Sequence, residues 1–210
     1  MQIKTFVFNP FQLNTYVLFD ETKSCVIIDP GCNDDDEEKE LDDFIVSNGL
    51  IPKHCLLTHC HVDHVLGLNF AEKKYGLKTA ANEEGLQFIR TASHYAAAFG
   101  FDVDEVNVPV TFINDGDEIR FGNSILKVLE TPGHAAGSVC LLAEADKFVI
   151  SGDVLFFESI GRTDLPTGNL DFLFESIQTK LFTLPSDFTV YPGHGHETTI
   201  GHEKLNNPFL

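Results

Sequence analysis

The chain has 210 residues, of which 43% are hydrophobic, enough for one globular domain with a sizeable core. Its 32 acidic and 14 basic residues give a formal net charge of -18, which argues against binding to nucleic acid or anionic membranes. The five cysteines include no CxxC pair, so a disulfide framework is not expected. The first residues lack the features of a secretory signal, and no apolar run has the length of a membrane span. We therefore expect a soluble cytoplasmic protein.

The first part of the chain predicts short strands followed by a helix. Runs rich in β-branched and aromatic residues predict strands at 3–8, 14–19, 25–29 and 53–57. Residues 34–47 predict the helix, which Asn48-Gly49 ends. Its apolar face is expected to contain Leu41, Phe44, Ile45 and Val46. The acidic run at 34–40 could be a cation site, but acids in the first turns of a helix suit its dipole, and we favour that interpretation.

The remaining elements also alternate between helices and strands. A helix is predicted after the segment 59–64, to about residue 75, and short strands are predicted between 110 and 150. A further helical stretch from 83 to about 99 has these residues near helical spacing: Phe88, Ile89, Ala92, Ala96 and Phe99. A helix at 170–181, a strand at 188–191 and a short helix or turn at 200–210 complete the chain. Without a linker or internal repeat, residues 1–210 are expected to form one α/β domain with mixed sheets.

A cluster of possible metal ligands follows the fourth predicted strand. His59, His61, Asp63 and His64 place three imidazoles and a carboxylate within six residues. Nitrogen and carboxylate oxygen are donors that suit zinc, iron or manganese. Burying so many polar groups without partners would be costly, so a purely structural role is disfavoured. In a tight loop, His59 and His61 can face one point while Asp63 and His64 face a neighbouring one, which would serve two adjacent metals.

Three later loops contribute similar groups at the ends of predicted apolar strands. Thr131-Pro132-Gly133 precedes His134, Ser151-Gly152 precedes Asp153, and Pro192-Gly193 precedes His194. Each loop alone is weak evidence because Pro-Gly turns are common. Their shared position after apolar strands indicates a common site.

These four stretches resemble the metallo-β-lactamase-fold hydrolases in motif and order, over nearly the whole chain. The matching residues are T-H-x-H-x-D-H at 58–64, T-P-G-H at 131–134, S-G-D at 151–153 and P-G-H at 192–194. The resemblance implies an αββα sandwich of two mixed sheets flanked by helices, with the site at one edge. It also implies two divalent metal ions, expected to be zinc, with iron and manganese as alternatives. One ion would be held by His59, His61 and His134, the other by Asp63, His64 and His194, and Asp153 would bridge them.

Two further stretches are similar to the short glyoxalase II-like (hydroxyacylglutathione hydrolase-like) branch of that family. They are Gly161 to Asn169 and Thr198 to Phe209. Two features depart from the family. Only 16 residues follow His194, so the C-terminal helical domain that helps to bind glutathione in full-length members is not expected here. In addition, His196 stands in a P-G-H-G-H-E sequence. Arg162 and Lys204 are cations in the family-like stretches and are candidate contacts for an anionic thioester, with a structural salt bridge as the alternative.

The function expected from these residues is metal-dependent hydrolysis of small-molecule thioesters such as S-lactoylglutathione. A hydroxide bridging two metal ions about 3.5–4 Å apart would attack the thioester carbonyl, and Asp63 would orient it and accept its proton. The alternatives are a mononuclear iron persulfide dioxygenase and a lactone or β-lactam hydrolase. A non-catalytic site is disfavoured because structural sites prefer thiolate-rich, closed ligation. The other histidines are expected to be surface or packing residues, Cys60 is expected to point away from the metals, and the sequence does not indicate the oligomeric state.

Overall fold

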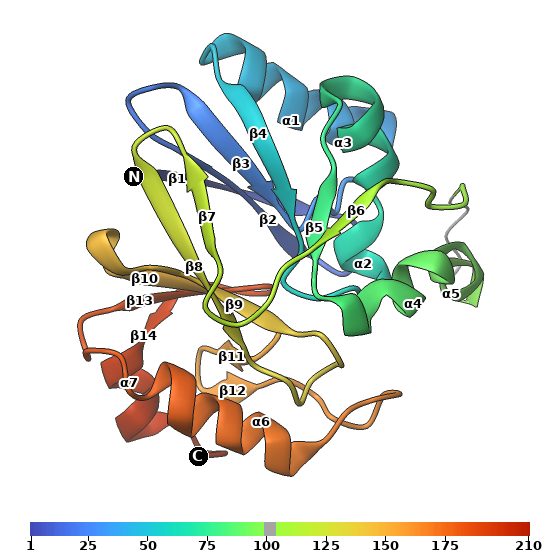
Figure 1. Ribbon diagram of the computed structural model, residues 1–210. Coiled ribbons are helices and arrows are strands. Elements are labelled where there is room, and N and C mark those ends of the chain that lie inside the picture. Colours follow the sequence, from blue (N-terminus) through green and yellow to red (C-terminus); the bar gives the residue numbers. More distant parts are fainter. Residues whose placement is uncertain (99–103) are drawn as a thin grey trace.

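A computed structural model describes residues 1–98 and 104–210. Two six-stranded sheets lie face to face and helices cover their outer faces (Figure 1). The first sheet has the order β1 (Gln2–Phe8), β2 (Leu13–Phe19), β3 (Ser24–Ile28), β4 (Ile51–Leu56), β5 (Thr79–Ala81) and β6 (Val110–Phe112). The second has the order β14 (Thr198–Thr199), β13 (Thr189–Pro192), β10 (Phe148–Gly152), β9 (Val139–Ala143), β8 (Ser124–Glu130) and β7 (Glu118–Phe121).

Both sheets are mixed. In the first, β1, β2 and β3 pair antiparallel, whereas β3 to β6 pair parallel. In the second, only β10 and β13 pair parallel, with β10 also antiparallel to β9 and β9 antiparallel to β8. A small hairpin of β11 (Leu155–Phe156) and β12 (Ser159–Ile160) follows β10. In the second sheet, β8, β10 and β13 therefore run in one direction and end at the same edge.

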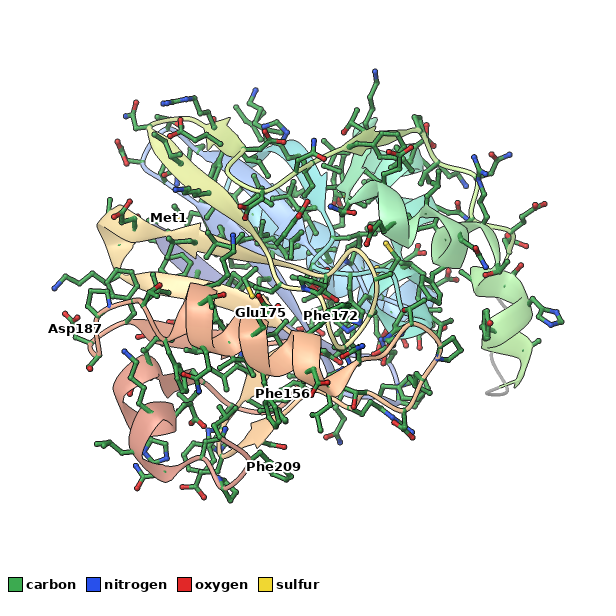
Figure 2. All side chains as sticks on the ribbon, turned by 60° about the horizontal axis from the view of Figure 1, so that its bottom comes forward. Met1, Phe156, Phe172, Glu175, Asp187 and Phe209 are labelled. Atoms are coloured by element: carbon green, nitrogen blue, oxygen red, sulfur yellow. The ribbon has the colours of Figure 1, made fainter. Side chains whose placement is uncertain are left out.

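The helices of the first half lie on the first sheet and along its edge. They are α1 (Asp35–Ser47), α2 (Val62–Val65), α3 (Leu68–Tyr75), α4 (Leu86–Arg90) and α5 (Ala92–Ala98), with a short 3-10 turn at Glu83–Gly85. The second sheet is covered by α6 (Leu170–Ser176), which continues as a π-helical segment (Ile177–Leu181), and by α7 (Ile200–Asn206). Figure 2 shows α6 across the outer face of the molecule, with Phe172 and Glu175 on it.

Three apolar layers hold this arrangement together. Leu41 of α1 and Leu68 of α3 pack on the outer face of the first sheet. Leu126 and Leu141 of the second sheet pack against Leu56 of the first, and all three are fully buried. A third cluster packs α6 and α7 on the second sheet through Leu173 and Ile200. The expected αββα sandwich is confirmed, and burial of apolar surface in all three layers stabilises it.

The start of α1 explains the acidic run. The Asp34 side chain caps the helix by accepting hydrogen bonds from the backbone N–H groups of Asp36 (3.1 Å) and Glu37 (3.0 Å). Four acids in the first turn then face the positive end of the helix dipole. The interpretation of this run as a helix start is confirmed, and Asn48 forms the C-cap as expected.

Several details differ from the sequence-based expectation. Val46 is 67% exposed rather than part of the apolar face of α1, because it lies beyond the stripe formed by Leu41 and Ile45. The helical stretch from residue 83 is broken at Thr91, and Phe99 lies outside the described residues. Three short elements were missed: β5, the β11–β12 hairpin and β14. Among the described helices, none combines the length and apolar character needed to cross a membrane.

Candidate metal centre

Four loops meet at one edge of the two sheets, and each follows the carboxyl end of a strand. The loop after β4 contains His59, His61, Asp63 and His64. The loops after β8, β10 and β13 place His134, Asp153 and His194 at the same edge, because these three strands run in one direction. All seven predicted ligands are therefore brought together, although they lie up to 135 positions apart in the sequence, from 59 to 194.

The first group consists of His59, His61 and His134. The Nε2 atom of His59 lies 3.0 Å from Nδ1 of His61 and 3.2 Å from Nε2 of His134. Nδ1 of His61 and Nε2 of His134 are 2.9 Å apart. A tetrahedral ion with metal–nitrogen distances of about 2.0–2.1 Å needs donors roughly 3.3–3.4 Å apart. The triangle is close to that size, so these nitrogens fit one metal ion.

The second group consists of Asp63, His64 and His194. Oδ2 of Asp63 lies 3.2 Å from Nε2 of His194 and 3.6 Å from Nε2 of His64. These ligand atoms lie within 4.8 Å of one another, as do those of the first group. An oxygen and two imidazole nitrogens form a donor set suited to a divalent transition metal.

Asp153 lies between the two groups. Its Oδ2 is 3.6 Å from Nε2 of both His134 and His194, and its Oδ1 is 3.6 Å from Nε2 of His64. Gly193 makes room for this carboxylate, since a Cβ atom there would come within 2.1 Å of Oδ1. One carboxylate thus reaches ligands of both groups, as a bridging ligand must.

The outward-facing nitrogens of three imidazoles contact oxygen atoms, which orients the rings. His134 uses Nδ1 to contact the carbonyl of Arg162 at 2.8 Å, and His194 uses Nδ1 to contact the carbonyl of Phe11 at 3.0 Å. Nδ1 of His64 lies 3.0 Å from Oδ2 of Asp29. These contacts leave Nε2 of each ring facing the site, the arrangement that orients and tunes metal-binding histidines.

Asp29 is the residue that the sequence interpretation missed. It is 1% exposed, and its carboxylate accepts hydrogen bonds from Thr58 N at 2.8 Å and from Thr58 Oγ1 at 2.7 Å. It was seen only as the last residue of a predicted strand. The signal available was its position: an acid at the end of an apolar strand, like Asp153.

The pKa shifts of His59, His61 and Asp63 favour metal binding, whereas the pKa values of His64 and His194 are raised. Burial, followed by the neighbouring histidines, lowers the pKa of His59 well below its usual value and that of His61 to about 3, which keeps their lone pairs free. Burial lowers the pKa of His64, but the carboxylates of Asp63, Asp29 and Asp153 outweigh it and raise the pKa to about 10. Burial raises the pKa of Asp63, but His64 and His194 lower it more, so this carboxyl is ionised at neutral pH.

Unpaired polar atoms give an independent test of the fit. Nε2 of His64 and Oδ1 of Asp153 are buried and have no hydrogen-bond partner among the described residues. Buried polar atoms without partners are rare because leaving them unpaired is costly. Both face the centre of the seven side chains, where a cation would satisfy them.

The two predicted substrate contacts lie in different places. Arg162 lines the cavity beside the ligands, and its guanidinium binds Asp164 through two hydrogen bonds of 2.7 and 2.8 Å. Lys204 does not line this cavity: its Nζ donates to the carbonyl of Leu184 at 3.1 Å and lies over the ring of Phe182. The structure therefore brings only Arg162 close to the centre.

The remaining histidines and Cys60 lie apart from the ligand groups. His54 contacts the carbonyl of Arg120, His202 pairs with Glu158, and His196 packs on the ring of Phe157. His94 is exposed on α5. Cys60 is buried in the first apolar cluster, where its Sγ packs against Gly85, and burial raises its pKa to about 12. A thiol in that position is protonated, and Cys60 also contributes to the lining of the cavity beside the ligands.

The sequence matches the model of the Metallo-beta-lactamase superfamily over residues 8–194, and the fold agrees with that family. The chain belongs to this superfamily. Its members and named relatives support a hydrolase-type enzyme, and the His/Asp cluster indicates divalent metals.

Two curated proteins and two solved structures are similar to this chain over nearly its whole length. The chain is 37% identical to "Probable metallo-hydrolase YqgX" of Bacillus subtilis, over 96% of this chain and 93% of the relative. It is 34% identical to "Hydroxyacylglutathione hydrolase GloC" of Haemophilus influenzae, over 100% and 98% of the two chains. Among solved structures, BLEG-1 B3 metallo-beta-lactamase has a TM-score of 0.91 at 31% identity, covering 100% and 99%. TTHA1623 in a di-iron-bound form has a TM-score of 0.89 at 35% identity, covering 99% and 100%.

Proposed function

We propose that this chain hydrolyses thioesters of small molecules, of the kind represented by S-lactoylglutathione, with two divalent metal ions at the centre described above. The observation that carries the proposal is the pair of ligand groups joined by Asp153 beside an accessible cavity of about 300 Å³. The similarity to the hydroxyacylglutathione hydrolase GloC supports the choice of a thioester. Zinc is the proposed metal, and the di-iron form of TTHA1623 makes iron the first alternative.

The proposed metal ligands are those described above. His59, His61 and His134 would hold one ion and Asp63, His64 and His194 the other, with Asp153 between them. When bound, such ions supply Lewis acidity and lower the pKa of a water molecule toward neutrality. Each ion would draw ligands from two separate loops or more, so its position depends on the packing of both sheets.

Asp63 is proposed as the catalytic residue. Its carboxyl has a pKa below the usual value, so it is ionised at neutral pH and accepts a hydrogen bond from the attacking water. The water oxygen would bond to the thioester carbonyl carbon, and the carbon–sulfur bond would break to give a carboxylic acid and a thiol. Because a thiolate leaves readily, the reaction does not need a strong general acid.

The test is steady-state hydrolysis of S-lactoylglutathione by protein loaded separately with zinc, iron and manganese. Loss of thioester absorbance is followed, with a chelator-treated sample of each preparation as the control. We expect turnover that the chelator abolishes and that returns when metal is added back. Folded, fully loaded protein that turns over neither S-lactoylglutathione nor a simple neutral thioester would contradict the proposal.

Two alternatives are separated by the same preparations. A persulfide dioxygenase would work with one iron and would consume oxygen, whereas the proposed hydrolase would hold two ions per chain. A β-lactam or lactone hydrolase would use the same attack on a carbonyl, and the similarity to BLEG-1 makes a β-lactam the next substrate to test. Metal content per chain, oxygen uptake and β-lactam opening therefore complete the experiment.

A further inference from the structure

The turn between β1 and β2 contributes no metal ligand, but one of its side chains contacts the second ligand group. The turn spans residues 9–12 and is closed by a hydrogen bond of 3.0 Å from Gln12 N to the carbonyl of Asn9. Asn9 has a positive φ of 53°, a conformation that asparagine adopts more readily than most residues because its side chain can bond locally. Here its Oδ1 accepts a hydrogen bond from Phe11 N at 3.0 Å. The amide of Asn9 is therefore held in a fixed direction.

This amide reaches the loop that contains Asp63. Nδ2 of Asn9 donates to the carbonyl of Gly31 at 2.9 Å and to the carbonyl of Asp63 at 3.1 Å, and the residue is 8% exposed. Gly31 leaves room for the contact, since a Cβ atom there would lie 2.9 Å from both Nδ2 of Asn9 and the carbonyl oxygen of Asp63. Asn9 thus fixes the backbone of one ligand of the second group.

A second asparagine, Asn14 in β2, holds the loop of His194. Its backbone N–H donates to the carbonyl of Gly193 at 2.7 Å. Its Nδ2 donates to the carbonyls of Pro192 and Gly195 at 3.0 and 2.8 Å. Asn14 is 3% exposed, so bulk water does not compete for these bonds. The backbone on both sides of His194 is therefore fixed to the first sheet.

The next residue of β2, Thr15, supports the remaining ligand through Asp29. The hydroxyl of Thr15 donates to the carbonyl of Asp29 at 2.6 Å and accepts from Gly31 N at 3.0 Å. Asp29 has a positive φ of 49°, which is unfavourable for most residues, and its carboxylate lies 3.0 Å from Nδ1 of His64. Thr15 therefore holds the backbone of the residue that orients His64.

The first ligand group is supported from other parts of the chain. Nδ1 of His134 contacts the carbonyl of Arg162 at 2.8 Å, and Nδ1 of His59 lies 3.3 Å from Oγ1 of Thr58. Among the described residues, the first group has no hydrogen bond to either asparagine or to the threonine of the segment 9–15. The two groups therefore differ in what holds them.

We propose that Asn9, Asn14 and Thr15 are positioning residues for the second ligand group, so that the segment 9–15 controls the affinity for the second metal ion and not for the first. The inference rests on the two-ion centre of the proposed function and names the part of the chain that prepares half of it. Ligands that are already held in place bind an ion more tightly, because less freedom is lost on binding.

Two variants remove the amides, and a third is the matched control. Asn9→Gly deletes one amide and keeps the backbone, because glycine adopts a positive φ readily. Asn14→Ala deletes the other. Asn207→Ala is the control, since Asn207 is 7% exposed and its Nδ2 donates to the carbonyl of Ser159 at 3.1 Å and to Glu203 at 2.8 Å, with no contact to a ligand loop. Should Asn14→Ala fail to fold, Asn9→Gly alone still tests the proposal.

The measurement is the number of zinc ions per folded chain, counted by native mass spectrometry at free zinc concentrations fixed by chelator buffers. We expect two ions in the wild type and in Asn207→Ala. In Asn9→Gly and Asn14→Ala, the affinity for the second ion should fall about 10–100-fold, the usual cost of losing a group that supports a ligand. The affinity for the first ion should stay within about twofold. Unchanged binding of both ions, or an equal loss of both, would overturn the inference.

Double variants show which group is affected. His194→Ala already breaks the second group, so adding Asn9→Gly should change the affinity for the remaining ion little. His134→Ala breaks the first group, so adding Asn9→Gly should weaken the remaining ion about 10–100-fold. A general loss of stability would weaken binding by the same factor in both backgrounds, and that result would contradict a positioning role.

Zinc binding is measured without substrate, which separates this inference from the proposed function. Selective loss of the second ion, with no hydrolysis of any thioester by the loaded wild type, would support the inference and remove the thioesterase. Hydrolysis by the wild type, with both ions kept in Asn9→Gly and Asn14→Ala, would keep the thioesterase and overturn the inference. A wild-type chain that holds only one ion would overturn the two-ion centre and the inference together.

Discussion

The two halves of the molecule supply the metal centre in different ways. The first sheet provides four ligands from a single loop after β4, whereas the second sheet provides His134, Asp153 and His194 from three separate loops. Each ligand group combines two residues of the first half with one of the second, and Asp153 lies between them. The loop after β4 therefore supplies two of the three ligands of each group, and the second half supplies the third. A metal ion bound here must join the two sheets.

The largest effect is expected when His134 is removed, because it is the ligand that the second half contributes to the first group. In His134→Ala, turnover should fall on the order of a thousandfold, because several kcal/mol of metal-assisted stabilisation is lost. The fold should be kept, since His134 lies at the sheet edge rather than in a core layer. Metal content and kcat/KM are measured, with His202→Ala as the control histidine outside the centre. Unchanged turnover in His134→Ala would refute the role given to the second half.

The next largest effect is expected on the free energy of unfolding, from a substitution in the apolar layer between the two sheets. Leu126→Ala removes a fully buried side chain from the layer between them and should lower the free energy of unfolding by about 2–5 kcal/mol. Ile125→Ala, on the same strand but 39% exposed, is the control and should cost clearly less. Urea unfolding with and without metal measures both. Because metal binds across the sheets, loading should recover part of the lost stability in Leu126→Ala; no gain on loading would contradict that linkage.

A smaller loss of metal affinity is expected from a substitution confined to the first half. Asp29→Asn keeps the shape of the side chain but removes the charge beside Nδ1 of His64. Loss of such a supporting group typically costs about 10–100-fold in metal affinity or activity. Competition with a chromophoric chelator measures the affinity. Asp20→Asn is the control, because Asp20 is another buried acid, which accepts hydrogen bonds from Thr22 N in its own turn and from Asn123 N, away from the metal centre. If both variants bind metal equally well, Asp29 does not support the site.

The smallest expected effect is a loss of stability from a substitution in the first half that lies away from the metal centre. Asp34→Ala removes the N-cap of α1 in the first half and should cost about 1 kcal/mol of stability. Its kcat/KM should stay the same, since α1 supplies no ligand. Thermal unfolding and steady-state kinetics are compared with wild type. A loss of activity or metal in this variant would revive the interpretation of the acidic run as a cation site.

The same comparison explains what sequence could predict. The loop at 59–64 is a local signal, because ligands so close together must share a neighbourhood whatever the fold. His134, Asp153 and His194 are ordinary residues in Pro-Gly or Gly turns. Their shared position after apolar strands indicated a common site, and the resemblance to a known family assigned each of them to a metal ion. The αββα layering likewise came from that resemblance, since periodicity does not specify which strands are neighbours.

Other features were outside the reach of local patterns. Asp29 was missed because its role depends on the distance to His64, which the chain crosses through α1 and β4. Lys204 was expected near the substrate, but the path of α7 takes it to Leu184 and Phe182. Three-residue β5 is too short to give a periodic signal, and Val46 was misplaced by one step around the helix.

The division of ligands between the halves also has a consequence for synthesis. The ribosome releases the chain from its amino end, so the loop with four ligands emerges well before β13 and His194 exist. The first ligand group is completed when His134 has been made, and the second only with His194. The complete set of ligands therefore exists only after β13 has been made, late in synthesis.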